Sequence, residues 1–282
     1  MKRISLFIFF LTLSLVLIVF GIKLITANDL EKVNSFRIYY RDIDERILNE
    51  MSGYDLVIVE ALHFTKNDVE LVTSNNKTLI FGYLSLMEIG NWDEKIIDSL
   101  NSSDYLYIKG KKVVSNENYL GNIANEHYQD VLIDTVKERI TAKGMDGVFF
   151  DTIGIIDQYS NDPEIYNLLF SGYENFLKKF KKELPKTYII QNRGFNILSM
   201  SSKYLDGFLW ENFRAQDIDL SKSVLTRIEN LKLISKRENL VIFTESYNFP
   251  GENITYTQKL GWIHFQNNSD QHSNWDMMNN DN

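Results

Sequence analysis

The stretch GMDGVFFDTIG, Gly144 to Gly154, reads as a helix end, a buried strand and a carboxylate at the end of that strand. A second stretch, YLDGFLWENF, Tyr204 to Phe213, repeats the order: Asp-Gly, an apolar run, then an acid. Ionised side chains are almost never buried without a partner, so packing alone does not explain an acid in this position. The repetition predicts that two strands deliver Asp151 and Glu211 to the same end of one sheet.

Six further apolar runs are spread along the chain, and all eight are near-continuous rather than alternating. Such runs are typical of parallel strands buried on both faces. Helix-like segments separate them, which predicts a (β/α)8 TIM barrel. The alternative is an open doubly wound sheet, but YYRDIDER rather than a glycine-rich phosphate loop follows the first run. The runs span residues 36–40, 55–61, 78–86, 146–151, 187–192, 206–211, 239–246 and 261–267.

The N-terminus resembles an export signal. Lys2 and Arg3 precede an apolar run over residues 4–22, and Ala27 offers a cleavage site. This pattern predicts a signal peptide, while the length of the run leaves an uncleaved membrane anchor as the alternative. In both cases the body is expected to be extracellular or at the cell surface. The predicted organisation is a signal peptide or anchor over 1–27, a barrel over 33–270 and a polar tail over 271–282.

The composition excludes several classes of protein. The 282 residues include no cysteine, which rules out disulfides, thiolate metal sites and a cysteine nucleophile. The formal net charge is −8, and removing Lys2, Arg3 and Lys23 leaves −11, which disfavours nucleic acid as a partner. The four histidines lack zinc-motif spacing and no GxSxG elbow occurs, so a metal-dependent deacetylase and a serine hydrolase lack their motifs. No metal or other cofactor is expected.

Polar side chains dominate the predicted C-terminal ends of the strands, where a TIM barrel carries its active site. Asp151 and Glu211 are the predicted catalytic pair, and strand alternation turns them inward together with Phe149 and Leu209. The two acids that precede these strands, Asp146 and Asp206, are predicted turn or capping residues at the opposite end. The predicted substrate-binding residues are Tyr40, Asp42, Glu60, Tyr83, Ser85, Glu88, Asn192, Arg193, Glu245 and Tyr247.

Two facing carboxylates suit the cleavage of a glycosidic bond. One acid must be protonated to help the leaving oxygen depart, and the other must be charged to attack the sugar or activate water. Mutual repulsion and burial push the two pKa values apart, which creates the two roles. We assign Glu211 as the nucleophile and Asp151 as the acid/base. The carboxyl separation, and with it retention or inversion, stays open at this point. Trp92 and Trp210 are further candidates for sugar stacking, although Trp210 alternatively faces the helices.

These residues resemble the glycoside hydrolase family 114 superfamily, the endo-α-1,4-polygalactosaminidases and related secreted barrel proteins. The similar stretches are GYLSLMEIGNW (82–92), residues 125–154, IIQNRGF (189–195) and DGFLWENF (206–213). The resemblance implies a (β/α)8 barrel, no metal, the same catalytic pair and a substrate of α-1,4-linked galactosamine, a cationic polymer.

Three positions depart from the pattern of that superfamily. Met87 stands where a glycine usually precedes the acid Glu88, and NWDEK replaces a stretch that often holds an arginine. Ser246 is inserted between Glu245 and Tyr247. We therefore expect a secreted or surface-anchored endo-acting glycoside hydrolase that cleaves an amino-sugar exopolysaccharide. The alternative is a non-catalytic glycan-binding surface protein on a degenerate barrel.

Overall fold

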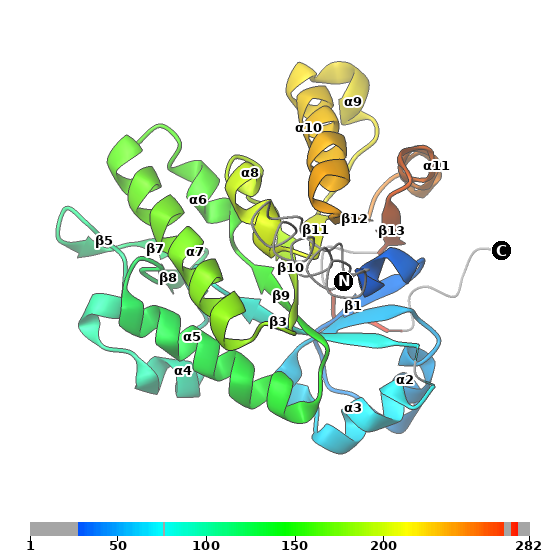
Figure 1. Ribbon diagram of the computed structural model, residues 1–282, viewed down its shortest axis with the longest axis horizontal. Helices are drawn as coiled ribbons and strands as arrows, with labels where there is room; N and C mark the ends of the chain where they lie inside the picture. The colour runs from blue at the N-terminus through cyan, green and yellow to red at the C-terminus, as the bar shows by residue number, and fades with distance from the viewer. Residues whose placement is uncertain (1–27, 76, 268–271, 276–282) are drawn as a thin grey trace, which may run out of the picture.

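The computed structural model describes residues 28–75, 77–267 and 272–275, so the predicted signal or anchor segment lies outside the described residues. Eight parallel strands form one sheet in the order β1-β2-β3-β9-β10-β11-β12-β13 (Figure 1). β1 and β13 lie side by side, so the barrel is nearly closed. The eight strands are β1 (Phe36–Tyr39), β2 (Leu56–Val59), β3 (Leu79–Ser85), β9 (Gly147–Asp151), β10 (Tyr188–Asn192), β11 (Gly207–Trp210), β12 (Val241–Ser246) and β13 (Ile263–Gln266).

Each strand lies within one of the eight predicted runs, so the prediction of a parallel eight-stranded barrel is confirmed and the open doubly wound sheet is wrong. Helices surround the strands on the outside (Figure 1). The larger ones are α2 (Glu45–Met51), α3 (Lys66–Thr73), α5 (Glu126–Arg139), α7 (Pro163–Glu183), α10 (Lys222–Glu238) and α11 (Pro250–Leu260). Four shorter helices are α4 (Glu94–Ser99), α6 (Gly154–Gln158), α8 (Leu198–Ser201) and α9 (Asp217–Leu220). Short 3-10 turns are η1 (Asp29–Lys32), η2 (Ala61–His63), η3 (Ser102–Asp104), η4 (Thr141–Lys143) and η5 (Ser202–Tyr204).

The strands bury two separate apolar layers because alternate residues face the barrel interior and the helices. Phe149 and Leu209 fill the interior, as strand alternation predicted, and Leu30 of η1 joins them there. Phe150 faces outward, with its ring 5.4 Å from that of Phe176 and 5.2 Å from that of Phe180, both on α7. Trp210 also faces the helices and belongs to the outer core, in line with the second of its two interpretations.

Asp146 and Asp206 accept backbone hydrogen bonds at the N-terminal ends of the strands, opposite to Asp151 and Glu211, as predicted. Oδ2 of Asp146 accepts the N–H of Ile80 at 2.9 Å, and Oδ2 of Asp206 accepts the N–H of Ile189 at 2.8 Å. Each carboxylate therefore caps the start of the neighbouring strand. The two Asp-Gly repeats thus place a structural acid at one end of the strand and a second acid at the other.

An insertion between β3 and α5 was not predicted. It contains a three-stranded antiparallel sheet of β4 (Glu88–Ile89), β8 (Asn118–Leu120) and β7 (Val114–Ser115), with a hairpin of β5 (Tyr107–Ile108) and β6 (Lys111–Lys112). Strands of two or three residues are too short to show an alternating pattern, so the sequence carries little signal for them. The insertion stands beside the C-terminal ends of the barrel strands, because β4 follows directly after β3.

Residues 272–275 of the predicted polar tail pack against the barrel beside β1. Tyr40 donates its backbone N–H to the carbonyl of His272 at 2.9 Å. The Trp275 ring lies 5.4 Å from that of Tyr39, and the Arg37 guanidinium stands 3.8 Å from the Trp275 ring. Trp275 Nε1 also donates to the carboxylate of Glu50 on α2. This short segment therefore covers the barrel next to the junction of β1 and β13.

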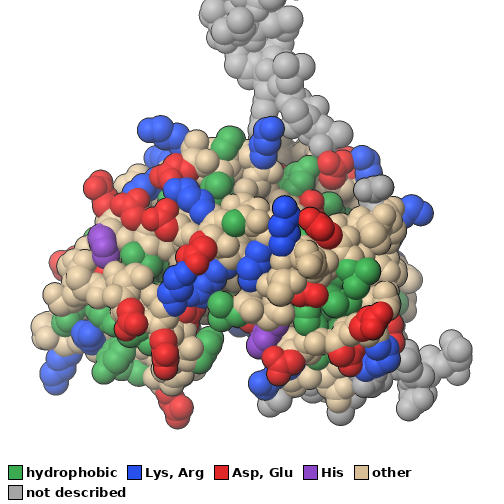
Figure 2. All heavy atoms as spheres, turned by 90° about the horizontal axis from the view of Figure 1, so that it is seen from below, with side chains coloured by type: hydrophobic (Ala, Val, Ile, Leu, Met, Phe, Trp, Pro, Cys, Tyr) green, Lys and Arg blue, Asp and Glu red, His purple; other side chains and the backbone are tan. Residues whose placement is uncertain are grey.

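Charged side chains are mixed on the surface. Figure 2 shows Asp and Glu side chains interspersed with Lys and Arg over the face that it presents. Within the described ranges, every helix is too short or too polar to cross a bilayer.

Candidate active site

Three neighbouring strands bring the predicted catalytic pair together. β9, β10 and β11 end on Asp151, Asn192 and, one residue beyond the strand, Glu211. The amide nitrogen of Asn192 donates to Asp151 Oδ1 at 2.8 Å and to Glu211 Oε2 at 3.0 Å. The hydroxyl of Tyr83, on β3, donates to the other oxygen of Asp151 at 3.0 Å. The two acids therefore share one donor and face the same space.

The shared donor fixes the separation of the acids. The two hydrogens of an amide nitrogen diverge by about 120°, so oxygens that each accept one of them lie about 5 Å apart. Glycosidases that retain the anomeric configuration hold their carboxyl groups about 5–5.5 Å apart, and inverting ones about 6.5–9.5 Å apart. The position of Asn192 thus favours the retaining geometry.

The orientation of the Asn192 amide is unfavourable for the free energy of folding. Its Oδ1 atom is buried and has no hydrogen-bond partner among the described residues. A buried acceptor without a partner costs about 1–3 kcal/mol. Rotating the amide would aim Oδ1 at two carboxylates, which is worse. The cost is explained if the amide serves Asp151 and Glu211 rather than the stability of the fold.

The residue after each of these three side chains has a left-handed backbone: φ is 67° at Thr152, 57° at Arg193 and 57° at Asn212. This region is strained for non-glycine residues, especially for β-branched threonine, and such strain gathers at functional sites. The Thr152 hydroxyl is tied into the β3 loop, where it accepts the N–H of Met87 at 2.8 Å and lies 3.1 Å from the Ser85 hydroxyl. The chain therefore turns sharply as soon as each side chain has reached the site.

The surroundings of Asp151 raise its pKa and favour its protonated form. Burial, followed by the neighbouring negative charge of Glu211, raises the pKa of Asp151, although the hydrogen bonds from Asn192 and Tyr83 oppose the shift. Burial and the charge of Asp151 also raise the pKa of Tyr83 well above its usual value, so its phenol stays protonated and donates. Burial therefore favours the protonated form of Asp151, which is the form that a general acid needs.

Replacing Tyr83 by Phe tests this charge balance. The lost hydrogen bond stabilises the ionised form of Asp151, so its pKa should rise further in Tyr83→Phe. If protonated Asp151 is the general acid, activity is lost as pH rises through its pKa, and the basic limb of kcat/KM should move to higher pH. The measurement is the pH profile of kcat/KM, with Tyr173→Phe, a buried tyrosine bonded to Gln191, as the control. A limb that stays in place or moves to lower pH would contradict this role of Tyr83.

Arg193 lies beside Glu211 at the open side of the site. Its Nε stands 3.9 Å from Glu211 Oε2, and its Nη2 lies 3.4 Å from the carbonyl of Glu211. The side chain of Glu211 is 37% exposed and Asp151 lies deeper, against Tyr83. The carboxylate of Glu211 is therefore accessible from solvent and lies close to the guanidinium of Arg193, as suits a charged nucleophile.

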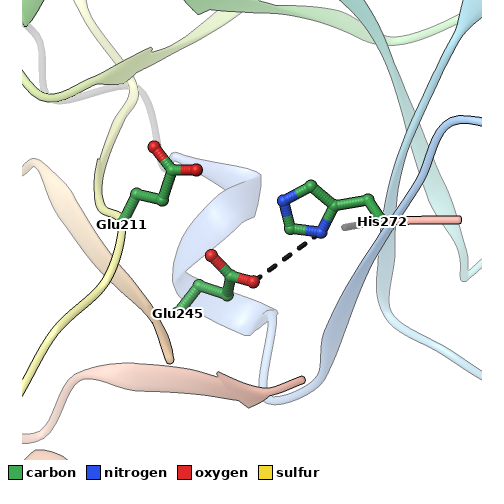
Figure 3. Close-up of side chains that lie close together, drawn as sticks. All are labelled: Glu211, Glu245 and His272. Atoms are coloured by element: carbon green, nitrogen blue, oxygen red, sulfur yellow. Dashed lines mark ion pairs between the residues drawn. The ribbon is translucent and has the colours of Figure 1, made fainter. Parts of the chain in front are cut away.

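A third acid, Glu245, lies close to Glu211 together with His272, as Figure 3 shows. His272 Nδ1 is 3.7 Å from Glu245 Oε1, and Asn267 Nδ2 is within 3.3 Å of both. His272 comes from the predicted tail, and sequence reasoning did not include it in the site. The available signal was Trp275, a large apolar residue in an otherwise polar tail, which indicates that the tail packs.

Glu211, Glu245 and His272 also form the one group, within the part of the chain that the structure describes, whose possible metal-binding atoms all lie within 4.8 Å of one another. Two carboxylates and an imidazole could hold a divalent cation. Here, however, Asn267 and the pairing of Glu245 with His272 account for the arrangement. The two carboxylates, Glu211 and Glu245, could therefore bind a cationic group.

The remaining predicted residues separate into those at the site and those beside it. The Tyr40 ring lies 4.8 Å from that of Tyr83 and 5.1 Å from that of His272, inside the site. Asp42 instead has a 96% exposed side chain that pairs with His63 at 2.9 Å. Tyr247 is half-buried after β12, and Ser246 faces outward, where its hydroxyl donates to Gln266 at 2.9 Å. The inserted serine therefore leaves Glu245 pointing inward.

Ser85, Glu60 and Glu88 lie around the β2 and β3 loops. The Ser85 hydroxyl donates to the carbonyl of Glu88 at 2.7 Å and therefore holds the loop. Glu60 caps η2 through the N–H of Leu62 at 3.2 Å. The Glu88 carboxylate accepts hydrogen bonds from Ser115 and from Asn116, each at 2.9 Å, and fastens the insertion to the rim.

An open groove of about 540 Å³ crosses the catalytic pair. Two of its lining residues, Asn116 in the insertion and Arg227 on α10, were not predicted from the sequence. It is lined by Tyr83, Glu88, Asn116, Asp151, Thr152, Gly154, Ile155, Asp157, Gln158, Asn192, Arg193, Gly194, Phe195, Trp210, Glu211 and Arg227. The groove is open to solvent, as the access of a polysaccharide requires.

Comparison with known proteins bears on the family and the fold. The model of a family described as hypothetical glycosyl hydrolase family 15 matches residues 87–280. The glycoside hydrolase domain of PelA from Pseudomonas aeruginosa has a similar fold, with a TM-score of 0.67 and 18% identity over 83% of this chain and 94% of that one. Ega3 of Aspergillus fumigatus, solved in complex with galactosamine, has a TM-score of 0.55 and 15% identity over 76% of this chain and 78% of that one. No curated protein matches the sequence. The family model thus confirms the resemblance to a glycoside hydrolase family, and the two solved structures agree with the barrel fold.

Proposed function

The chain belongs to the hypothetical glycosyl hydrolase family 15, and we propose that it cleaves glycosidic bonds through Asp151 and Glu211 with retention of configuration. The observation that carries the proposal is the single amide nitrogen of Asn192, bonded to both carboxylates. It explains how two acids on non-adjacent strands are held at the short separation that a covalent mechanism needs.

In the first step, Glu211 attacks the anomeric carbon while Asp151 passes its proton to the departing glycosidic oxygen. The bond between that carbon and the leaving oxygen breaks, and a glycosyl ester forms on Glu211. In the second step, Asp151, now ionised, takes a proton from water, whose oxygen attacks the same carbon and releases Glu211. The raised pKa of Asp151 suits the first step, and the loss of its proton prepares it for the second.

The proposed substrate is an exopolysaccharide of amino sugars, with α-1,4-linked galactosamine as the first candidate. Asp151 and Glu211 line the groove, Glu245 lies close to Glu211, and a cationic polymer offsets the charge of these carboxylates. The complex of Ega3 with galactosamine supports this substrate by analogy. The open groove supports endo cleavage. The N-terminal sequence supports export, with contact to the membrane only through residues 1–27 if they are not removed.

The departures from the superfamily pattern leave the pair intact. Met87 is buried, donates its N–H to Thr152 and accepts the N–H of Gly121 at its carbonyl. In NWDEK, Asp93 pairs with Arg139 on α5, at 2.8 Å between Oδ1 and Nη2. These contacts favour turnover over the alternative of a non-catalytic glycan-binding protein, which needs a disrupted pair.

The test is an assay of new reducing ends from α-1,4-galactosamine polymer and from its N-acetylated form. We expect release of oligosaccharides from the deacetylated polymer, with less from the acetylated one. Binding to the polymer without any release would favour the non-catalytic alternative, and release from neutral glucans instead would contradict the proposed substrate.

A further inference from the structure

Trp92 is a large aromatic residue that the fold leaves open to solvent. It is 60% exposed, although it stands directly beyond β4 at the edge of the active-site rim. The six-membered part of its indole lies over the backbone of Gly90, where a Cβ would come within 2.6 Å of the ring. Glycine at this position therefore lets the ring lie close to the chain. The result is a fixed flat apolar surface that faces water.

A small cavity of about 40 Å³, lined mostly by apolar side chains, has Trp92 in its wall. Its charged lining residues are Glu60, Glu88, Asp93 and Arg139. Asp93 and Arg139 neutralise each other through a two-point ion pair. Glu88 is held by Ser115 and Asn116 of the insertion, which are neutral donors. The net charge of the cavity is therefore negative, and its volume suits a small substituent rather than a whole sugar ring.

Glu60, like Glu88, forms no ion pair with a cation among the described residues, and the charges of His63 and Arg139 act on Glu60 only from further away. Its one hydrogen bond within the described chain comes from the N–H of Leu62. Burial raises the pKa of Glu60, so the charged form lacks full compensation. An ammonium group would supply that compensation, because opposite charges in a partly buried site attract more strongly than in water.

We propose that Trp92 and Glu60 form an additional subsite for an amino sugar, separate from the catalytic pair, with the sugar ring on the indole and its ammonium group directed at Glu60. The inference rests on the proposed function and extends it. Tyr83 and Glu88 line both this cavity and the catalytic groove, so the subsite continues the groove beyond Asp151. A polymer that crosses Glu211, Asn192 and Asp151 would place a further residue on Trp92.

The subsite is tested by calorimetric titration with α-1,4-galactosamine oligosaccharides, in the background of Asp151→Asn so that turnover is slow. Trp92→Ala should weaken the binding of long oligosaccharides about tenfold, because a stacked ring loses its partner. Glu60→Gln should weaken the amine form but not the N-acetylated form, since only the former carries the charge. The control is Tyr107→Ala, which removes a 43% exposed aromatic on the β5–β6 hairpin, outside both the cavity and the groove.

Unchanged affinity in Trp92→Ala, an equal loss in Tyr107→Ala, or no binding of any of these oligosaccharides would overturn the subsite. The hydrolase proposal fails differently, when the protein with Asp151 intact releases no reducing ends. With Asp151 intact, Trp92→Ala should raise KM for the polymer and leave cleavage of a short aryl glycoside unchanged. A loss of kcat on the short substrate would show that Trp92 acts in the catalytic site instead.

Discussion

Glu211→Gln should remove hydrolysis, with a fall in kcat/KM of about 10⁴-fold or more, the scale seen when a nucleophile is lost. The amide has nearly the shape of the carboxylate but cannot form the glycosyl ester. The measurement is the rate of new reducing ends from the galactosamine polymer, read beside the circular dichroism of the variant. An intact spectrum with lost activity places the effect on chemistry.

Two control variants sharpen this result. Asp206→Asn removes an acid from the opposite end of the same strand, where it caps β10 and pairs with Lys181. It should lower the thermal midpoint of unfolding and leave kcat unchanged. Glu245→Gln tests the rival acid beside Glu211, and we expect a smaller loss because Glu245 is buried and paired with His272. An inactive Glu245→Gln variant, found together with a Glu211→Gln variant that still turns over, would exchange the two roles.

Asp151→Asn should have the second largest effect, and its size should depend on the leaving group. With a sugar as the leaving group, which needs a proton, we expect a fall of about 10²–10⁴-fold. With a nitrophenyl glycoside the first step needs no acid, so the first turnover should be fast. The second step still lacks its base, so a burst of nitrophenol should precede a slow steady rate. Stopped-flow absorbance measures both phases, and a uniform loss without a burst would remove Asp151 from the acid role.

The main features of this site could be predicted because strand ends are predictable. Asp151 and Glu211 follow apolar runs directly, and parallel strands of a barrel bring their C-terminal ends to one rim. The sequence could also distinguish them from Asp146 and Asp206, because each of these two aspartates directly precedes its strand. The sequence pattern does not indicate that Asn192 donates hydrogen bonds to both acids. A polar residue after β10 was predicted, but a shared hydrogen bond depends on side-chain directions that no spacing encodes.

Other parts of the site could not be predicted for identifiable physical reasons. The wall formed by Asn116 rests on strands of two and three residues, which are too short for a periodic signal. His272 comes from a segment after the last strand, in contact with β1 at the other end of the chain. Asp42 was expected to face substrate and instead turns outward, because a polar residue after a strand can also find a surface partner, here His63.

The most direct test of the two-carboxylate mechanism is to trap its covalent intermediate. Asp151→Asn should react with α-galactosaminyl fluoride, because fluoride leaves without a proton, and should then stall because no base activates water. Peptide mass spectrometry after a rapid quench should find one hexosamine on the peptide that contains Glu211. A sugar on Glu245 or on any other residue, or steady turnover by the wild-type protein with no adduct trapped in the variant, would contradict the account.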